Sequence, residues 1–103
     1  MTKIIGQPNL KLTITKGESD RLAKIIACDE IIIMPGGTGT LEELLFVNET
    51  SRSNEHKKNI TLVNIDGFYN GLLQQINTNI REGLSKTTTI RFKVVNSVDQ
   101  LSI

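Results

Sequence analysis

Residues 31–45 read IIIMPGGTGTLEELL, an apolar run followed by a glycine-rich turn and then by apolar residues at helical spacing. The uninterrupted run 31–34 predicts a strand that is covered on both faces, as in a parallel sheet. The leucines after the turn share one stripe of a helix predicted over 40–54. A buried strand that passes through a short loop into a helix is the repeating unit of a parallel α/β sheet.

The rest of the chain alternates in the same way. The predicted strands cover 10–14, 31–34, 60–65 and 91–95, and the predicted helices cover 18–28, 40–54, 69–80 and 97–101. Gly83 is expected to end the third helix, and Ser97 to cap the last one. Strands separated by helices imply right-handed crossovers, so the sequence predicts an α/β fold with a Rossmann-like, doubly wound parallel sheet of about four strands. Ligands bind such sheets at the carboxyl ends of the strands, here after Met34 and Ile65.

Composition narrows the class of protein. The 103 residues suit a single domain, 1–103, and 12 Lys and Arg against 11 Asp and Glu leave a net charge of +1. This balance argues against a non-specific nucleic-acid binder, which needs a basic surplus. One cysteine and one histidine indicate neither a disulfide nor a zinc site. The sequence contains no apolar run of about 20 residues and no signal-peptide core, so we expect no membrane partner and a cytosolic location.

The glycine-rich turn predicts an anion site. Gly36, Gly37 and Gly39 permit positive φ angles and let backbone N–H groups approach a ligand with no Cβ in the way. The helix start adds unpaired donors and a partial positive charge, which favour phosphate. The loop lacks the lysine of a Walker A motif. A second interpretation stays open, in which Thr40 and Glu43 form a capping box around a simple tight turn.

Residues 35–43 match the PGGxGTxxE signature of the LOG-type family of nucleoside 5′-monophosphate phosphoribohydrolases, long labelled "lysine decarboxylase-like". Residues 28–34 resemble the strand that precedes this signature in the family, and 63–70 resemble its "LNxDGYYxxLL" segment. The resemblance implies an enzyme that hydrolyses the N-glycosidic bond of a nucleoside 5′-monophosphate to free base and ribose 5-phosphate. It implies no metal and no cofactor.

The resemblance also implies residue roles. Glu43 occupies the position of the family's catalytic glutamate, which would stabilise an oxocarbenium-like ribose and orient the attacking water. Arg21, in a segment similar to the family's ERKxxM, is the second catalytic candidate, although it lies one residue closer to the signature than in the family. The alternative for Arg21 is a solvated side chain on an amphipathic helix. The 5′-phosphate would be bound by Gly36, Gly37, Thr38, Gly39 and Thr40.

The family's domain is nearly twice as long, and this chain resembles its C-terminal half. We therefore expect the uncovered parts of the sheet to associate, giving a homo-oligomer, as in the typically dimeric family. Two alternatives to the enzyme stay open: a non-catalytic nucleotide-binding module, and an inactive fragment. The motif does not specify which base is bound.

Four further residues lie outside this motif. His56, in a charged stretch, is expected to be a solvated loop residue, and Cys28 a buried, unreactive thiol. Asp66 and Tyr69 follow the third strand, so they either reach the ligand or serve as a turn former and a helix-face residue.

Overall fold

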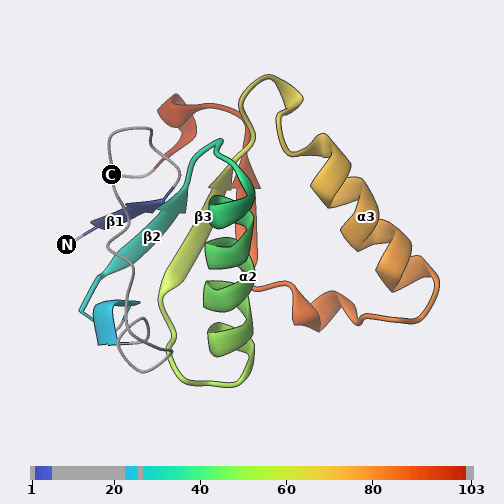
Figure 1. The fold of residues 1–103 in the computed structure, drawn as a ribbon, viewed down its shortest axis with the longest axis horizontal. Helices are drawn as coiled ribbons and strands as arrows, with labels where there is room; N and C mark the ends of the chain where they lie inside the picture. The colour runs from blue at the N-terminus through green and yellow to red at the C-terminus, as the bar shows by residue number, and fades with distance from the viewer. Residues whose placement is uncertain (1, 6–22, 26, 102–103) are drawn as a thin grey trace.

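The computed structural model describes residues 2–5, 23–25 and 27–101, which contain a four-stranded parallel sheet (Figure 1). Its strands are β1 (Thr2–Ile5), β2 (Glu30–Ile33), β3 (Asn59–Val63) and β4 (Phe92–Val95), and they are neighbours in that order. All three pairings are parallel. The partial Rossmann-like α/β fold is therefore confirmed, and the sequential strand order is that of one half of a doubly wound sheet.

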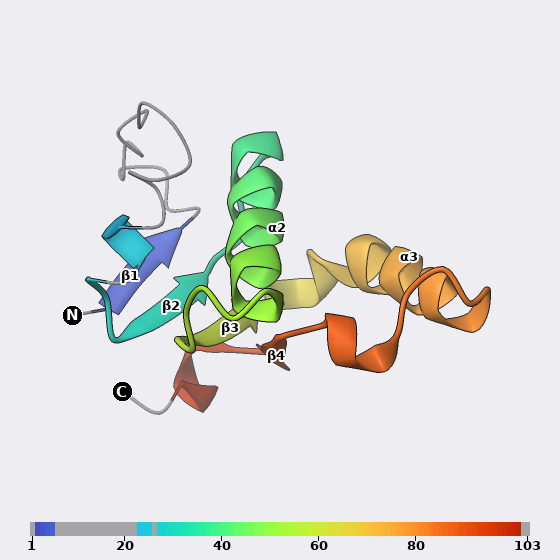
Figure 2. The same cartoon turned by 90° about the horizontal axis from the view of Figure 1, so that it is seen from below.

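Two long helices connect the strands: α2 (Thr38–Arg52) joins β2 to β3, and α3 (Asn70–Arg81) joins β3 to β4. Three short 3-10 helices are η1 (Ile65–Gly67), η2 (Thr87–Thr89) and η3 (Val98–Gln100). Figure 2 shows α2 and the helical turn 23–25 on one side of the sheet and η3 on the other. The predicted terminal helix is thus only the turn η3, and Ser97 makes no side-chain cap bond to it.

The first strand differs from the prediction. The strand predicted over 10–14 lies outside the described residues, whereas β1 is formed by Thr2–Ile5. Only two of its four residues are apolar, which is too short a pattern to indicate a strand. Pairing with β2 makes this segment a strand: Ile5 lies opposite Ile33, and the Met34 N–H donates to the Ile5 carbonyl at 2.8 Å.

The hydrophobic core lies between the sheet and α2. Its buried members are Ile5, Ile25, Ile31, Ile33, Leu44, Val47, Ile60, Leu62 and Tyr69. Ile32 and Val63 point to the opposite face of the sheet and are buried as well, so the two-sided coverage predicted for the strand 31–34 is confirmed. Each such side chain stabilises the fold by roughly 1.5–3 kcal/mol.

The conformation of the turn after β3 accounts for the glycine at position 67. Asp66 and Gly67 both adopt positive φ angles, of 52° and 72°. The positive φ of Gly67 favours glycine there, and a Cβ would lie 2.6 Å from Asn70 Nδ2, so the Asn70 side chain would have to shift. Asp66 is exposed, which agrees with the turn-forming alternative for this residue.

Helix α3 is amphipathic but little covered. Figure 1 shows it standing apart from the sheet, and none of its residues is buried. Leu72 and Leu73 pack against the core only in part. The helix ends as predicted at Gly83, whose φ is 76°, with N–H groups of Gly83 and Leu84 donating to the carbonyls of Ile80 and Asn79.

Candidate functional site

The glycine loop, residues 34–39, connects β2 to α2. Gly37 is the N-cap of α2 in an extended conformation, with φ −93° and ψ −157°, and the helix begins at Thr38. The N–H groups of Thr40 and Leu41 donate to the Gly37 carbonyl at 3.1 and 3.2 Å. The capping-box interpretation is therefore wrong, because Thr40 is already the third residue of the helix and is buried.

The glycines of this loop leave open space. Neither Gly37 nor Gly39 has a positive φ, so the expected conformational reason for glycine is wrong at these two positions. A Cβ built on either residue would meet nothing within 4 Å. Nothing within the described chain requires glycine there. What remains is the other expected reason, that the backbone is accessible to a ligand.

The first turn of α2 offers hydrogen-bond donors toward that space. Thr38 and Gly39 are exposed, and no acceptor in the described part of the chain is paired with their N–H groups. The first turn carries no acidic residue, so its partial positive charge is not offset there. This arrangement suits a phosphate or another small anion.

Of the two catalytic candidates, Glu43 lies within the described residues and Arg21 does not. Glu43 lies in the second turn of α2, half-buried, at the border of the buried stripe that includes Thr40, Leu44 and Val47. Because Thr40 is not the cap, a capping role no longer competes for the Glu43 carboxylate. Arg21 lies outside the described residues, so its position relative to Glu43 stays a prediction.

Tyr69 lies beneath the glycine loop. Its ring is 2% exposed, and its hydroxyl donates to the Met34 carbonyl at 2.7 Å. Burial raises the pKa of this phenol, and a hydrogen bond from the backbone of Gly36 acts in the opposite direction. Tyr69 therefore contacts the loop from the core side, through its hydroxyl group.

His56 was wrongly expected to be solvated. It is buried, its Nε2 lies 2.9 Å from the Val47 carbonyl, and its Nδ1 accepts the Lys58 N–H at 3.1 Å. Nδ1 is thus the acceptor, which assigns the proton to Nε2. The surrounding charged sequence gives no signal of this role, because the contact joins α2 to the segment before β3.

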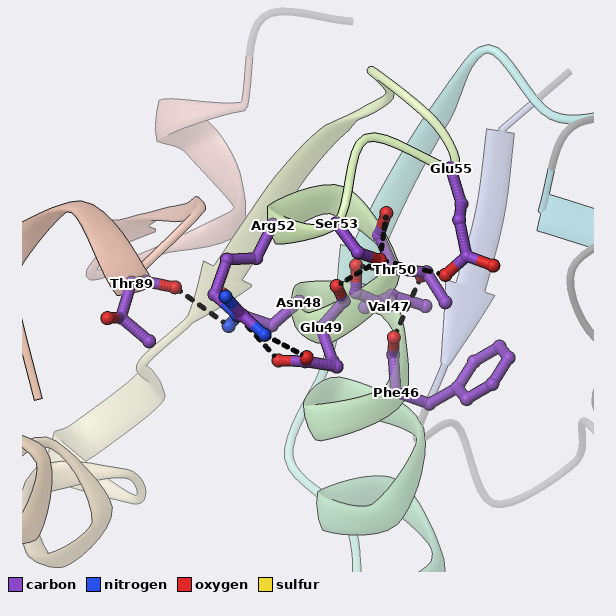
Figure 3. Close-up of polar contacts among 9 residues, drawn as sticks. All are labelled: Phe46, Val47, Asn48, Glu49, Thr50, Arg52, Ser53, Glu55 and Thr89. Atoms are coloured by element: carbon purple, nitrogen blue, oxygen red, sulfur yellow. Dashed lines mark hydrogen bonds and ion pairs between the residues drawn. The ribbon is translucent and has the colours of Figure 1, made fainter.

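The far end of α2 is densely hydrogen-bonded (Figure 3). Asn48 donates to the Thr89 carbonyl at 3.0 Å and accepts the Arg91 N–H at 2.8 Å, which fastens α2 to the segment before β4. Glu49 and Arg52 form an exposed ion pair. A cavity of about 540 Å³, whose lining includes Arg52, Lys86 and Arg91, lies at this end and not at the glycine loop.

Three remaining expectations concern single features. Cys28 is buried as predicted, with its thiol donating to the Lys24 carbonyl at 3.2 Å. Within the described ranges, no three His, Cys, Asp or Glu side chains gather as a metal site would require. None of the described helices is long and apolar enough to cross a membrane.

Comparison with known proteins points to one family. The family profile described as "Possible lysine decarboxylase" matches residues 2–102. The rice cytokinin riboside 5′-monophosphate phosphoribohydrolase LOG is 38% identical over 82 residues, which are 79% of this chain and 34% of that protein. The Arabidopsis enzymes LOG4 and LOG7 of the same name are 46% and 47% identical over 59 and 55 residues. Those alignments span 57% and 53% of this chain, but only 27% and 25% of the two relatives.

Proposed function

The chain belongs to the LOG-type family, the one described as "Possible lysine decarboxylase", and on this basis we propose that it acts in nucleotide hydrolysis. The reaction is cleavage of the N-glycosidic bond of a nucleoside 5′-monophosphate, which yields the free base and ribose 5-phosphate. The relatives are named for this hydrolysis of a cytokinin riboside 5′-monophosphate. Lysine decarboxylation is not favoured, because no lysine flanks the loop as a pyridoxal-phosphate enzyme would need.

The open glycine loop is the observation that supports this proposal most directly. Within the described residues, the N–H groups of Thr38 and Gly39 have no acceptor, and a Cβ on Gly37 or Gly39 would meet nothing within 4 Å. A 5′-phosphate satisfies such donors and complements the partial charge of the helix end. Gly36 and Thr40 complete the proposed phosphate loop, with the Thr40 N–H already bonded within the turn.

Glu43 is the proposed catalytic group. Cleavage of the C1′–N bond develops positive charge on the ribose, and a carboxylate one turn beyond the phosphate site can stabilise that charge. The same carboxylate can orient the attacking water or accept its proton. Arg21 is the proposed second catalytic residue, which would orient the substrate.

The chain spans about a third or less of the length of the curated relatives it matches. We propose that residues 1–103 form a single unit equivalent to the C-terminal half of the family's domain, which contributes the phosphate loop and Glu43. Hydrolysis is then carried out by the complete oligomeric assembly, to which this unit contributes the phosphate loop and Glu43.

We also propose that the chain forms a homo-oligomer, most simply a dimer. The apolar side of α3 is only half covered, and Val94 of β4 is 41% exposed. Apolar surface of this kind favours association. Sedimentation analysis of the purified chain tests this, and a monomer at all concentrations would contradict it.

The proposed reaction is tested with a panel of nucleoside 5′-monophosphates, measuring free base and ribose 5-phosphate by chromatography. We expect base release by the wild-type chain, a loss of at least about 100-fold in Glu43→Gln, and nearly full activity in Glu42→Gln. Glu42 is the matched control, since it is the adjacent carboxylate and is exposed. Nucleotide binding without base release would favour the binding module, and neither binding nor release would favour an inactive fragment.

A further inference from the structure

Tyr69 connects two loops that are far apart in the sequence but lie at the same edge of the sheet. It follows β3, whereas the carbonyl it binds, that of Met34, follows β2. The phenol hydroxyl contacts the loop by donating to the Met34 carbonyl at 2.7 Å. Pro35, with its fixed φ, follows Met34 directly.

Tyr69 is itself firmly held. Its backbone N–H donates to Asn64 Oδ1 at 2.6 Å, and the Asn64 side chain donates in turn to Asn70 Oδ1 at 2.8 Å. The Asn64 N–H donates to the Val95 carbonyl at 2.7 Å, which continues the pairing of β3 with β4. The Phe68 ring packs edge-on against the Tyr69 ring, with centroids 4.9 Å apart. The position of the phenol is therefore set by the sheet and the core.

We propose that Tyr69 is a positioning residue, which holds the glycine loop from the core side and so places the N–H groups at the start of α2 for a phosphate. The inference rests on the proposed function. Tyr69 is not a catalytic residue in this account, because its hydroxyl is bonded to the Met34 carbonyl of the loop and its side chain is buried.

Among the described residues, the other bond from the loop to the sheet is that of the Met34 N–H to the Ile5 carbonyl at 2.8 Å. Gly37 supplies no side-chain cap, and Gly37 and Gly39 make no contact through a Cβ. The backbone bonds at Gly37 join the loop to α2 but not to the sheet. Removing the phenol hydroxyl thus removes a connection between the loop and the core that no other described side chain replaces.

The test compares Tyr69→Phe with Asn48→Leu in the ligand-free full chain. Asn48 also joins distant segments through two hydrogen bonds, but at the opposite end of α2. Hydrogen exchange measured by NMR should accelerate about tenfold in Tyr69→Phe at the amides of Thr40 and Leu41, which donate to the Gly37 carbonyl, beyond the change in global stability. Asn48→Leu should leave these amides unchanged after the same correction. A uniform acceleration in both variants, or none at the loop in Tyr69→Phe, would overturn the proposal.

Titration with adenosine 5′-monophosphate then separates this inference from the proposed function. We expect the Kd to rise at least threefold in Tyr69→Phe and to stay within twofold of wild type in Asn48→Leu. An unchanged Kd in Tyr69→Phe overturns the positioning role even if the wild type is active. If the wild type binds no nucleotide, the proposed function of the loop fails, and the exchange data still decide whether Tyr69 holds the loop.

Discussion

The two ends of helix α2 are built in opposite ways. At the C-terminal end, Asn54 adopts a positive φ of 63° and the chain turns back on itself. The N–H groups of Asn54 and Glu55 donate to the carbonyls of Ser51 and Thr50 at 3.1 and 2.8 Å. The Ser53 hydroxyl donates to the Glu49 carbonyl at 3.0 Å. The terminal carbonyls of Glu49, Thr50 and Ser51 are thus bound by the protein's own groups.

The N-terminal end lacks such partners in the described chain. The cap is a glycine without a side-chain bond, the first turn has no acidic residue, and the N–H groups of Thr38 and Gly39 have no described acceptor. A Ser, Asp or Asn cap would satisfy one of these donors at no cost to the fold. The first end therefore stabilises the protein, whereas the second has donors that the proposed phosphate would bind.

The largest expected effect comes from filling the open end. Gly37→Asp adds a carboxylate that caps α2 and occupies the phosphate position. We expect the affinity for adenosine 5′-monophosphate to fall at least tenfold, while the free energy of unfolding stays level or rises by a few tenths of a kcal/mol. Isothermal titration and urea unfolding measure the two quantities.

Gly71→Asp is the matched control for this change. Gly71 lies in the first turn of α3, and a Cβ there also meets nothing within 4 Å. The Gly71→Asp substitution should stabilise α3 without changing the affinity for the nucleotide. Equal losses of affinity in both variants would show that charge alone, and not the α2 end, controls binding.

The second largest effect is expected from removing hydrogen bonds at the C-terminal end of α2. Asn48→Leu keeps the branched shape of the side chain but leaves the Thr89 carbonyl and the Arg91 N–H without their partner. We expect the free energy of unfolding to fall by about 2 kcal/mol. Denaturant titration measures this, and a change below about 0.5 kcal/mol would show that water replaces both bonds.

A smaller effect is expected at alkaline pH. Burial raises the pKa of Tyr69 above its usual value of 10.0, so the folded state keeps the phenol proton at a pH where the unfolded chain releases it. The stabilisation is complete below pH 10 and is lost as the pH rises through the folded pKa. The free energy of unfolding, measured from pH 8 to 11, should therefore decline more steeply in wild type than in Tyr69→Phe. Parallel curves would contradict the assignment.

The smallest effect is predicted for the exposed ion pair. The hydrogen bond from Arg52 lowers the pKa of Glu49, but both side chains are solvated, and pairs of this kind contribute little. Glu49→Gln should leave thermal unfolding unchanged within error at physiological salt. A clear loss of stability would place this pair in the network that closes the helix end.

Local patterns were enough for much of this molecule. The apolar run of β2, the stripe of α2 and the Asp-Gly turn before α3 each depend on neighbours within a few residues, so the sequence predicts them within about two positions. The PGGxGTxxE signature likewise identified the family, because its residues are contiguous. His56 and β1 were missed, because their partners come from other segments.

The sequence by itself determined the fold class, the location of the glycine loop and the candidate Glu43, since each is written in periodicity or in a contiguous motif. Only the tertiary structure decided that Gly37 and not Thr40 caps α2, that two loop glycines face open space, and that Tyr69 holds the loop from below. The physical reason is the distance along the chain between the residues that interact. A hydrogen bond between residues 35 positions apart, or the emptiness beside a glycine, exists only once the strands have paired and the helix has packed.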